Sequence, residues 1–337
     1  MSIYFSVRAV SQEVFSFKTL NNGTYELVKF SNTGNITDLT VGYVSAASYD
    51  ANDPSGKTII TQDKTKPVTV LHEYAFNCDE KLEIIHIGKE VAEIDGKSFY
   101  SCWALREIRV DPENKYYCDI DGVLYTKDLK TLVCYPISHD QYVRANYGYD
   151  DWVASDDPAY QDFRDRVLTY VVPSATEKIE MLAFNYASLT DIYLPEGLRE
   201  IGTLAFFKAT ILENIRSYTA AQPITDTTFV GEDVFATLYP SLPEGVESIG
   251  SDAFNHDQAL TYMYIPSSVT YIGHHAFWEC VYKDGGDLRG LAQMHIAASE
   301  PDFHANTHTG DQWRPQYDYM LFKKTIDTNY SAVRAAD

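Results

Sequence analysis

A phenylalanine recurs along this chain in a fixed apolar setting, and this repetition constrains the fold more than any other feature. Each phenylalanine follows a small residue directly and an aliphatic residue by five positions. The anchoring residues are Phe76, Phe99, Phe184, Phe206, Phe254 and Phe277. The aliphatic residues are Leu71, Ile94, Ile179, Ile201, Ile249 and Ile272. Such recurrence indicates stacked units, because one short unit cannot bury its apolar face alone.

The spacing of the phenylalanines sets the length of the unit. Successive anchors lie 23, 85, 22, 48 and 23 residues apart, so the basic unit has 22 or 23 residues. The spacing of 48 is close to two units, and we interpret residues 221–241, around Phe229, as a degenerate repeat. The spacing of 85 contains one or more insertions. A period of this length predicts a solenoid in which each unit contacts its neighbours.

Each unit also contains a short strand. An alternating apolar run follows most anchors, as in Ile85 and Ile87, Ile108 and Val110, Ile192 and Leu194, and Met263 and Ile265. This alternation has the period of a strand that buries one face. The residues from Ile249 to Phe254 predict a tight corner, either helical or a turn, that Ser or Asp can cap. We therefore expect a mainly β solenoid with short helical turns.

The net charge of the chain excludes some classes of binding partner. Its 337 residues include 48 Asp and Glu against 27 Lys and Arg, a formal net charge of −21. Such a surface repels phosphate backbones and anionic lipid, so we expect no nucleic-acid partner. No apolar stretch approaches the roughly 18 residues of a membrane span, so we expect no membrane insertion. The start, MSIYFSVRAV, lacks the pattern of a secretion signal.

The cysteines do not predict a small disulfide-rich domain, because their number is odd: Cys78, Cys102, Cys118, Cys134 and Cys280. Three of them follow an anchoring phenylalanine by two or three residues. There a disulfide between stacked coils is possible, but buried free thiols are favoured. Cys118 and Cys134 lie on opposite arms of a predicted hairpin, from which they could face each other.

The repeats resemble a known family. The units GVESIGSDAFNHDQALTYMYIPSSVTYIGHHAFWEC and GLREIGTLAFFKATILENI look like the BspA-like leucine-rich repeat of bacterial surface proteins. The segment VDPENKYYCDIDGVLYTKDLKTLVCYP, at 110–136, resembles that family's β-hairpin insert. The tail, MHIAASEP and then YMLFKKTIDTNYSAV, is similar to its closing strands, although Lys323-Lys324 replaces a usual Val-Pro pair. The resemblance extends over residues 20–335.

The resemblance implies a fold and a place of action. It implies a right-handed leucine-rich-repeat solenoid in one continuous domain. Residues 1–66 would form the N-terminal strands and cap, 67–297 the repeats and 298–337 the C-terminal cap. The repeats would carry the hairpin insert at 111–136 and an acidic, aromatic insertion at 137–167. The family implies a secreted or cell-surface adhesion module, and it does not identify one ligand.

The strand positions between the buried residues form the first candidate binding surface. Stacked in register, they would make one continuous outward-facing strip, called here the sheet strip. Tyr and Arg are common anchors of binding interfaces. The alternative is a solvated face with scattered aromatics. The candidate residues are Glu107, Arg109, Asp191, Tyr193, Asn214, Arg216, Tyr262, Tyr264 and His295.

The insertion at 137–167 is the second candidate, because long loops on a rigid scaffold often carry function. It mixes aromatic and acidic residues and would suit a basic or glycan partner. The alternative, slightly favoured, is an insertion that packs on the solenoid and buries Trp152. The candidate residues are Tyr147, Tyr149, Asp151, Trp152 and Tyr160.

Metal binding and catalysis have weak support in the sequence. The paired acids of the insertion lack the alternating spacing of calcium loops. His304 and His308 are four residues apart but lie in a Pro- and Gly-bounded loop rather than on a helix. No nucleophile elbow, phosphate loop or CxxC motif is present. We therefore expect no metal, no cofactor and no catalytic residues.

Three functions are compatible with these patterns. The first is a non-catalytic module that binds a protein or glycan of a host or neighbouring cell. The second is a spacer or stalk that presents another module; the Tyr and Arg pairs of the strip count against it. The third is an enzyme with a site assembled by insertions, which would require a deep pocket of convergent acids and histidines.

Overall fold

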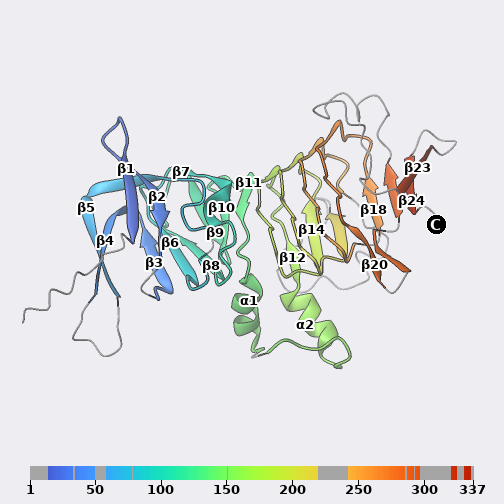
Figure 1. The fold of residues 1–337 in the computed structure, drawn as a ribbon, viewed down its shortest axis with the longest axis horizontal. Helices are drawn as coiled ribbons and strands as arrows, with labels where there is room; N and C mark the ends of the chain where they lie inside the picture. The colour runs from blue at the N-terminus through green and yellow to red at the C-terminus, as the bar shows by residue number, and fades with distance from the viewer. Residues whose placement is uncertain are drawn as a thin grey trace, which may run out of the picture.

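The computed structural model describes residues 14–32, 35–49, 58–77, 79–149, 151–218, 242–260, 262–284, 287–291, 293–296, 320–324 and 330–334. Within these residues the chain is mainly β, and its two α-helices both lie between β11 and β12. The strands follow one another along the long axis of the molecule in nearly the order of the sequence (Figure 1). This arrangement is what local, unit-to-unit packing requires.

The N-terminal part is a five-stranded sheet in the order β1-β2-β5-β4, with β7 also paired to β5. β5 is long, and it crosses the expected boundary between residues 66 and 67. It pairs antiparallel with β4 and parallel with β2 and β7. One strand thus joins the N-terminal sheet to the first repeat. The strands are β1 (Phe15–Thr19), β2 (Tyr25–Phe30), β4 (Tyr43–Tyr49), β5 (Thr58–Leu71) and β7 (Glu93–Ile94).

A ladder of short parallel strands brings equivalent positions of successive units side by side. Lys178 pairs with Glu200, and Ser248 pairs with Tyr271, which are spacings of 22 and 23 residues. Each strand makes only a few hydrogen bonds, so the ladder depends on side-chain packing beneath it. The strands are β11 (Thr131–Cys134), β13 (Lys178–Ile179), β15 (Glu200–Ile201), β17 (Ser248–Ile249) and β19 (Tyr271–Ile272).

Three further sheets carry the sheet strip, so in the described residues the strip is divided rather than continuous. The first contains β3 (Asp38–Val41), β6 (Ile84–Ile87) and β8 (Glu107–Val110). The second contains β12 (Thr169–Val171), β14 (Asp191–Pro195) and β16 (Asn214–Tyr218). The third contains β18 (Tyr262–Ile265), β22 (Gln293–Ile296), β24 (Tyr330–Arg334) and β23 (Met320–Lys324). A separate hairpin pairs β20 (Val281–Asp284) with β21 (Asp287–Gly290).

The hairpin insert lies between the two large apolar cores. β9 (Tyr117–Ile120), β10 (Val123–Thr126) and β11 pair antiparallel. Val123 and Tyr125 of β10 pack in the C-terminal core, whereas Leu124 packs in the N-terminal core. All three side chains are fully buried. Since alternate residues of a strand face opposite sides, this one strand contributes to both cores.

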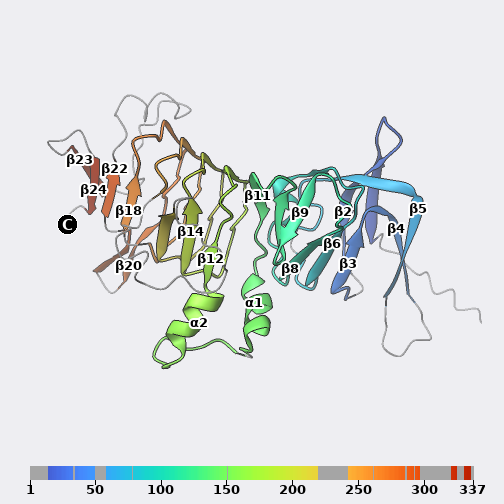
Figure 2. The same cartoon turned by 180° about the vertical axis from the view of Figure 1, so that it is seen from behind.

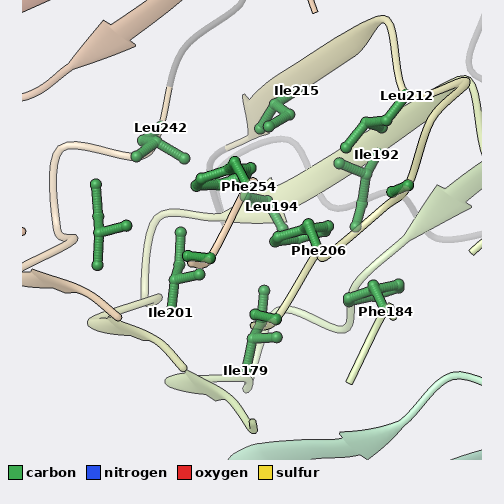
Figure 3. Packing of buried hydrophobic residues seen from close by; sticks show 14 of the residues in the cluster. Ile179, Phe184, Ile192, Leu194, Ile201, Phe206, Leu212, Ile215, Leu242 and Phe254 are labelled. Carbon is green, nitrogen blue, oxygen red and sulfur yellow. The ribbon is translucent and has the colours of Figure 1, made fainter. Parts of the chain in front are cut away.

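The anchoring phenylalanines form stacked columns, as the repeat predicts (Figure 3). Phe184 stacks on Phe206 with ring centroids 4.9 Å apart, and Phe206 stacks on Phe254 at 5.0 Å. Phe277, which is only partly buried, continues the column at 5.3 Å. Phe76 and Phe99 form a second stack at 5.6 Å. These separations are close to the roughly 4.8 Å between neighbouring strands, so rings and backbone stack with one period.

The corners of the repeats are turns shaped by left-handed residues. Tyr186 and Leu182 flank Phe184 by two positions, with φ of 56° and 63°. Neither residue is a glycine, so the sequence gives no sign that the backbone is left-handed here. Their N–H groups donate to the carbonyls of Phe207 and Thr203 in the next unit, at 2.9 and 3.1 Å. These bonds between units offset the roughly 1–2 kcal/mol cost of each left-handed residue.

The predicted degenerate repeat at 221–241 lies outside the described residues. On either side of it, Ile201 of β15 pairs directly with Ile249 of β17. Phe206 also stacks directly on Phe254. The two units on either side of these residues are therefore direct neighbours in the ladder and in the phenylalanine column.

Among the described residues, Cys118, Cys134 and Cys280 are free thiols. Cys102 and Cys280 are buried, and each thiol donates to the carbonyl of a phenylalanine in the preceding unit, at 3.0 and 2.9 Å. Cys118 and Cys134 do not face each other, because β10 lies between their strands. Cys118 packs against the C-terminal core and Cys134 belongs to the N-terminal core. Cys78 lies outside the described residues.

The phenylalanine column yields a first prediction. We expect Phe206→Ala to lower the free energy of unfolding by about 3–5 kcal/mol, because it removes a buried ring between two others. Phe207→Ala changes the adjacent, half-buried residue and is the matched control. Denaturant unfolding followed by circular dichroism measures both. Equal losses in the two variants would contradict a special role for the column.

A buried acid yields a second prediction. Asp257 is fully buried; its Oδ1 accepts the Ala209 N–H at 2.9 Å, and its Oδ2 has no hydrogen-bond partner among the described residues. Burial raises the pKa of this carboxyl well above its usual range. The folded state therefore keeps a proton that the unfolded chain releases near pH 4, and stability is lost as the pH rises above that value.

We expect Asp257→Asn to stabilise the protein in a pH-dependent way. The amide keeps the acceptor for Ala209 and removes the need to protonate the side chain. The gain in the free energy of unfolding over the wild type should be small at pH 4 and should increase towards pH 7, by about 1.4 kcal/mol per pH unit at most, and the gain in Tm should increase with it. Thermal unfolding at several pH values measures the difference, and a gain that does not change with pH would refute this explanation.

Candidate functional site

The residues of the sheet strip lie in register within their sheets. Arg109 pairs with His86 of the neighbouring strand, and Asp191 pairs with Asn214. Tyr193 pairs with Arg216 beside them. The parallel register therefore places side chains of one kind of position in a row, as the repeat predicts.

The third sheet carries the C-terminal part of the strip. Tyr262 pairs with Gln293, and Tyr264 pairs with His295. The Tyr264 hydroxyl donates to Glu244 Oε1 at 3.1 Å. The side chains of Tyr262 and His295 are not among those described, so only their backbone positions are assigned.

Glu107 differs from the expectation that it faces solvent. Only 6% of the residue is exposed. Arg109 donates two hydrogen bonds to its carboxylate, at 2.5 and 2.9 Å, and half of the Arg109 side chain stays exposed. Gly122, in the turn between β9 and β10, lies against Glu107 and covers it. The acid therefore positions Arg109, which is the accessible group of the pair.

Asp191 is also buried and lies at the centre of a polar network. Its residue exposure is 6%. Its Oδ1 accepts from the Asn214 amide at 2.9 Å, and its Oδ2 accepts from the Thr190 hydroxyl at 2.8 Å. Arg216 Nε lies 3.9 Å from Oδ1. A carboxylate with this many partners holds its neighbours in fixed positions.

The strongest partner of Asp191 comes from the insertion. Arg164 donates through Nε and Nη2 to Asp191 Oδ2, at 2.8 and 2.7 Å, and its Nη2 also lies 2.9 Å from Glu213 Oε2. Burial by itself would lower the pKa of Arg164, but the two carboxylates outweigh it and raise the pKa. The guanidinium of Arg164 thus holds the insertion on the second sheet, and this set of ion pairs is called here the clamp. The insertion and the second sheet of the strip therefore lie side by side, and these two parts together are called here the composite site.

The insertion consists of two helices with a small core of their own, which we call the helical insertion. Helix α1 spans His139–Tyr147 and helix α2 spans Tyr160–Val167, and both project from one edge of the molecule (Figure 2). Phe163 is fully buried, with the rings of Tyr149 and Trp152 packed edge-on at 5.2 and 5.3 Å. The prediction of a loop from the sequence was therefore wrong for the residues of these two helices.

The other candidate residues of the insertion surround this small core. Trp152 remains 49% exposed and Tyr147 38% exposed. The insertion packs on the sheet, but it does not bury Trp152 as the favoured alternative expected. The Tyr149 hydroxyl donates to Asp162, and Tyr160 is half-buried. Asp151 is exposed.

Helix α1 is anchored by its first residue. His139 is buried, its Nδ1 lies 3.1 Å from the Arg106 carbonyl oxygen, and its ring packs edge-on against Tyr135 at 4.8 Å. Burial lowers the pKa of His139 to about 4. The imidazole is therefore neutral at neutral pH and acts as a packing residue.

Sequence reasoning missed Arg164 and Glu213. One signal was available: Tyr160, Phe163 and Val167 are apolar at positions i, i+3 and i+7, the spacing of an amphipathic helix. That pattern predicts α2, but it does not place Arg164 against Asp191. The ion pair joins residues 27 positions apart in the sequence, and only packing brings them together.

Within the described residues, no three His, Cys, Asp or Glu side chains form a group that could hold a metal ion. His304 and His308 lie outside these residues. No helix in the described ranges is long and apolar enough to cross a membrane. The site therefore offers fixed charges and aromatic surface, with no assigned metal or cofactor.

Comparison with known proteins agrees with the repeat pattern. The family model of the BspA-type leucine-rich-repeat region matches residues 29–120 and 161–283 in six copies. The gap between the two matched ranges contains most of the hairpin insert and helix α1. No curated protein sequence matches the chain significantly.

Several solved structures resemble the chain. The pneumococcal vaccine antigen PcpA shares 17% identity with a TM-score of 0.41, over 79% of this chain and 77% of that one. A leucine-rich-repeat protein of T. pallidum shares 16% identity with a TM-score of 0.39, over 79% and 86%. A leucine-rich cell surface protein of Faecalibacterium prausnitzii shares 20% identity with a TM-score of 0.29, over 79% and 73%.

The clamp yields a third prediction. We expect Arg164→Ala to release α2 from the sheet and to cost about 2–3 kcal/mol of stability, because it leaves a buried carboxylate short of its main partner. Hydrogen exchange over residues 160–171 should accelerate. Arg166→Ala is the control, because Arg166 pairs with Asp162 on its own helix. Similar exchange in both variants would show that the clamp does not hold the insertion.

Proposed function

Because the chain belongs to the BspA-type leucine-rich-repeat family, we propose that it is a non-catalytic protein that binds another macromolecule at the cell surface or after secretion. The observation that carries this proposal is the ion pair between Arg164 and buried Asp191. This ion pair joins the helical insertion to the second sheet of the strip, and in our proposal the two present one rigid surface. A preorganised surface loses little conformational entropy on binding.

The partner we propose is a protein or a glycan. Tyr193 and Arg216 are half-buried at the sheet end of the composite site. Trp152 and Tyr147 are exposed at the insertion end. Aromatic residues and arginine dominate the energetics of interfaces, because they combine large contact area with hydrogen bonding. No step of chemistry is assigned to these residues.

We infer that the units wind as a right-handed solenoid in one continuous domain, with units of 22–23 residues. The parallel pairing of Lys178 with Glu200 and of Ser248 with Tyr271 supports that unit length. Connections between parallel strands of one sheet are right-handed in about 98% of cases. Such a body is stiff along its length and suits a large contact surface.

A binding measurement tests the proposal. The purified chain is applied to an array of host and bacterial proteins and glycans, and hits are measured in solution. We expect saturable binding that falls at least about tenfold in Tyr193→Ala/Arg216→Ala and in Tyr147→Ala/Trp152→Ala, because central aromatic and arginine anchors typically contribute more than about 1 kcal/mol each.

Tyr74→Ala is the matched control, because Tyr74 is 43% exposed and packs edge-on against Tyr100, outside the residues of the composite site. Binding that both site variants retain would place the contact elsewhere on the molecule. The absence of any saturable binding would argue for a spacer that presents another module.

A further inference from the structure

An open groove lies at the start of β11 and β13, where the hairpin insert meets the next repeat. It encloses about 620 Å³. The residues that matter for its chemistry are Lys115, Tyr116, Lys127, Lys130, Glu177 and Lys178. Helices α1 and α2 project from the other edge of the molecule (Figure 2). The groove is therefore separate from the composite site.

The groove is positive on a chain that is strongly negative. Four lysines line it with two acids, Asp128 and Glu177, whereas the whole chain carries a formal net charge of −21. A group of lysines on an otherwise acidic surface determines where an anion binds, because the rest of the surface repels the anion.

The acids of the groove are already engaged. Glu177 pairs with Lys130 at 2.8 Å. Asp128 accepts from the Thr126 hydroxyl at 2.8 Å and from the Lys130 backbone N–H at 3.1 Å, and these bonds lower its pKa. Glu177 is therefore paired with Lys130, whereas Asp128 stays ionised within its own turn, and neither acid forms an ion pair with Lys115 or Lys127 in the described residues.

Two lysines keep an uncompensated charge. Lys127 Nζ donates to the Pro112 carbonyl at 3.3 Å, and no carboxylate of the described residues lies within 4.0 Å of it. Lys115 likewise has no ion pair within the described part of the chain. Lys178, by contrast, bridges Glu180 and Glu200 at 3.2 Å each. Both lysines without an ion pair are backbone neighbours of Tyr116, since Lys115 precedes it in the chain and the Lys127 N–H donates to its carbonyl.

The backbone holds this part of the groove rigidly. Asn114 is 1% exposed; its amide donates to the carbonyls of Gly88 and Val91, and its oxygen accepts the N–H groups of Tyr116 and Tyr117 at 2.8 Å. The N–H of Lys127 donates to the Tyr116 carbonyl at 2.7 Å. Tyr116 is 52% exposed. The backbone that carries this exposed aromatic residue is thus fixed in the wall that also carries Lys115 and Lys127.

We propose that this groove binds an acidic polysaccharide that carries uronate carboxylates. The Tyr116 ring offers a flat apolar face for a sugar ring and a hydroxyl for its polar groups. Lys115 and Lys127 supply charge-assisted hydrogen bonds to carboxylates along the sugar chain. An open groove accepts a segment of a long chain, whereas small ligands are usually held in enclosed pockets.

The charge density of the ligand distinguishes it from nucleic acid. Duplex DNA carries one negative charge per roughly 1.7 Å of its axis. Two free lysines cannot offset the repulsion between such a ligand and this acidic surface. A uronate chain carries at most one carboxylate per sugar, so the two lysines can match the charges that lie within the groove.

The test measures binding of the full chain to polygalacturonate and to hyaluronate at low salt, with a heavily sulfated polysaccharide, neutral dextran and single-stranded DNA as further arms. We expect binding to the uronate chains that weakens as salt is added. Lys115→Gln/Lys127→Gln should weaken it at least tenfold, and Tyr116→Ala should weaken it severalfold.

Lys66→Gln/Lys89→Gln is the control, because it removes the same charge from two lysines that already have acid partners. It should bind within twofold of the wild type, as should Tyr193→Ala/Arg216→Ala, whose site belongs to the separate proposed function. Circular dichroism checks that each variant is folded. The proposal is overturned if the wild type binds neither uronate chain, if the Lys115/Lys127 variant binds as tightly as the wild type, or if DNA or the sulfated chain binds more tightly.

Discussion

The stacking of one buried ring on the next is the interaction on which the rest of this structure depends. The column through Phe184, Phe206 and Phe254 has centroid separations of 4.9 and 5.0 Å. Neighbouring parallel strands require nearly the same spacing, so ring stacking and backbone pairing reinforce each other. No single unit could bury its phenylalanine, and a change in one unit is therefore felt by both neighbours. This cooperativity explains why the small residue before each ring, such as Ala205, is fully buried: a larger side chain would prevent the close approach of the next unit.

The inserts use this regular scaffold in two different ways. The hairpin insert is part of the core, because β10 presents Tyr125 to one apolar cluster and Leu124 to the other. Its outer edge then builds the lysine-lined groove on a rigid base. The helical insertion has only a small core of its own around Phe163, and it is tied to the sheet by the ion pair of Arg164 with Asp191. A buried ion pair contributes little net stability but fixes geometry, since either charge alone would be costly to bury.

The composite site and the lysine-lined groove differ in their charge, and they therefore suit different kinds of contact. In the composite site, the carboxylates of Asp191 and Glu213 compensate Arg164, so this surface offers aromatic area and polar contacts more than net charge. In the groove, Lys115 and Lys127 keep their charge because the acids nearby are bound to other groups. The two proposals therefore call for contacts of different chemistry, and we expect variants of one site to leave binding at the other unchanged.

The sequence by itself determined the repeat and the buried positions of its units. Phe206, Ile201 and Ala205 could be assigned to the core because a fixed spacing within a short unit is a local property, and the structure places all three there. Tertiary structure alone decided which outward positions remain accessible: Glu107 and Asp191 have the strand parity of exposed residues, yet both are buried by partners from distant segments. It also decided that Ile201 pairs with Ile249 across 48 residues, and that turns with left-handed Tyr186 and Leu182 form the corners. Periodicity specifies which face of a strand a residue occupies. Whether an insertion covers that residue depends on contacts between segments far apart in the chain, and these contacts leave no local pattern in the sequence.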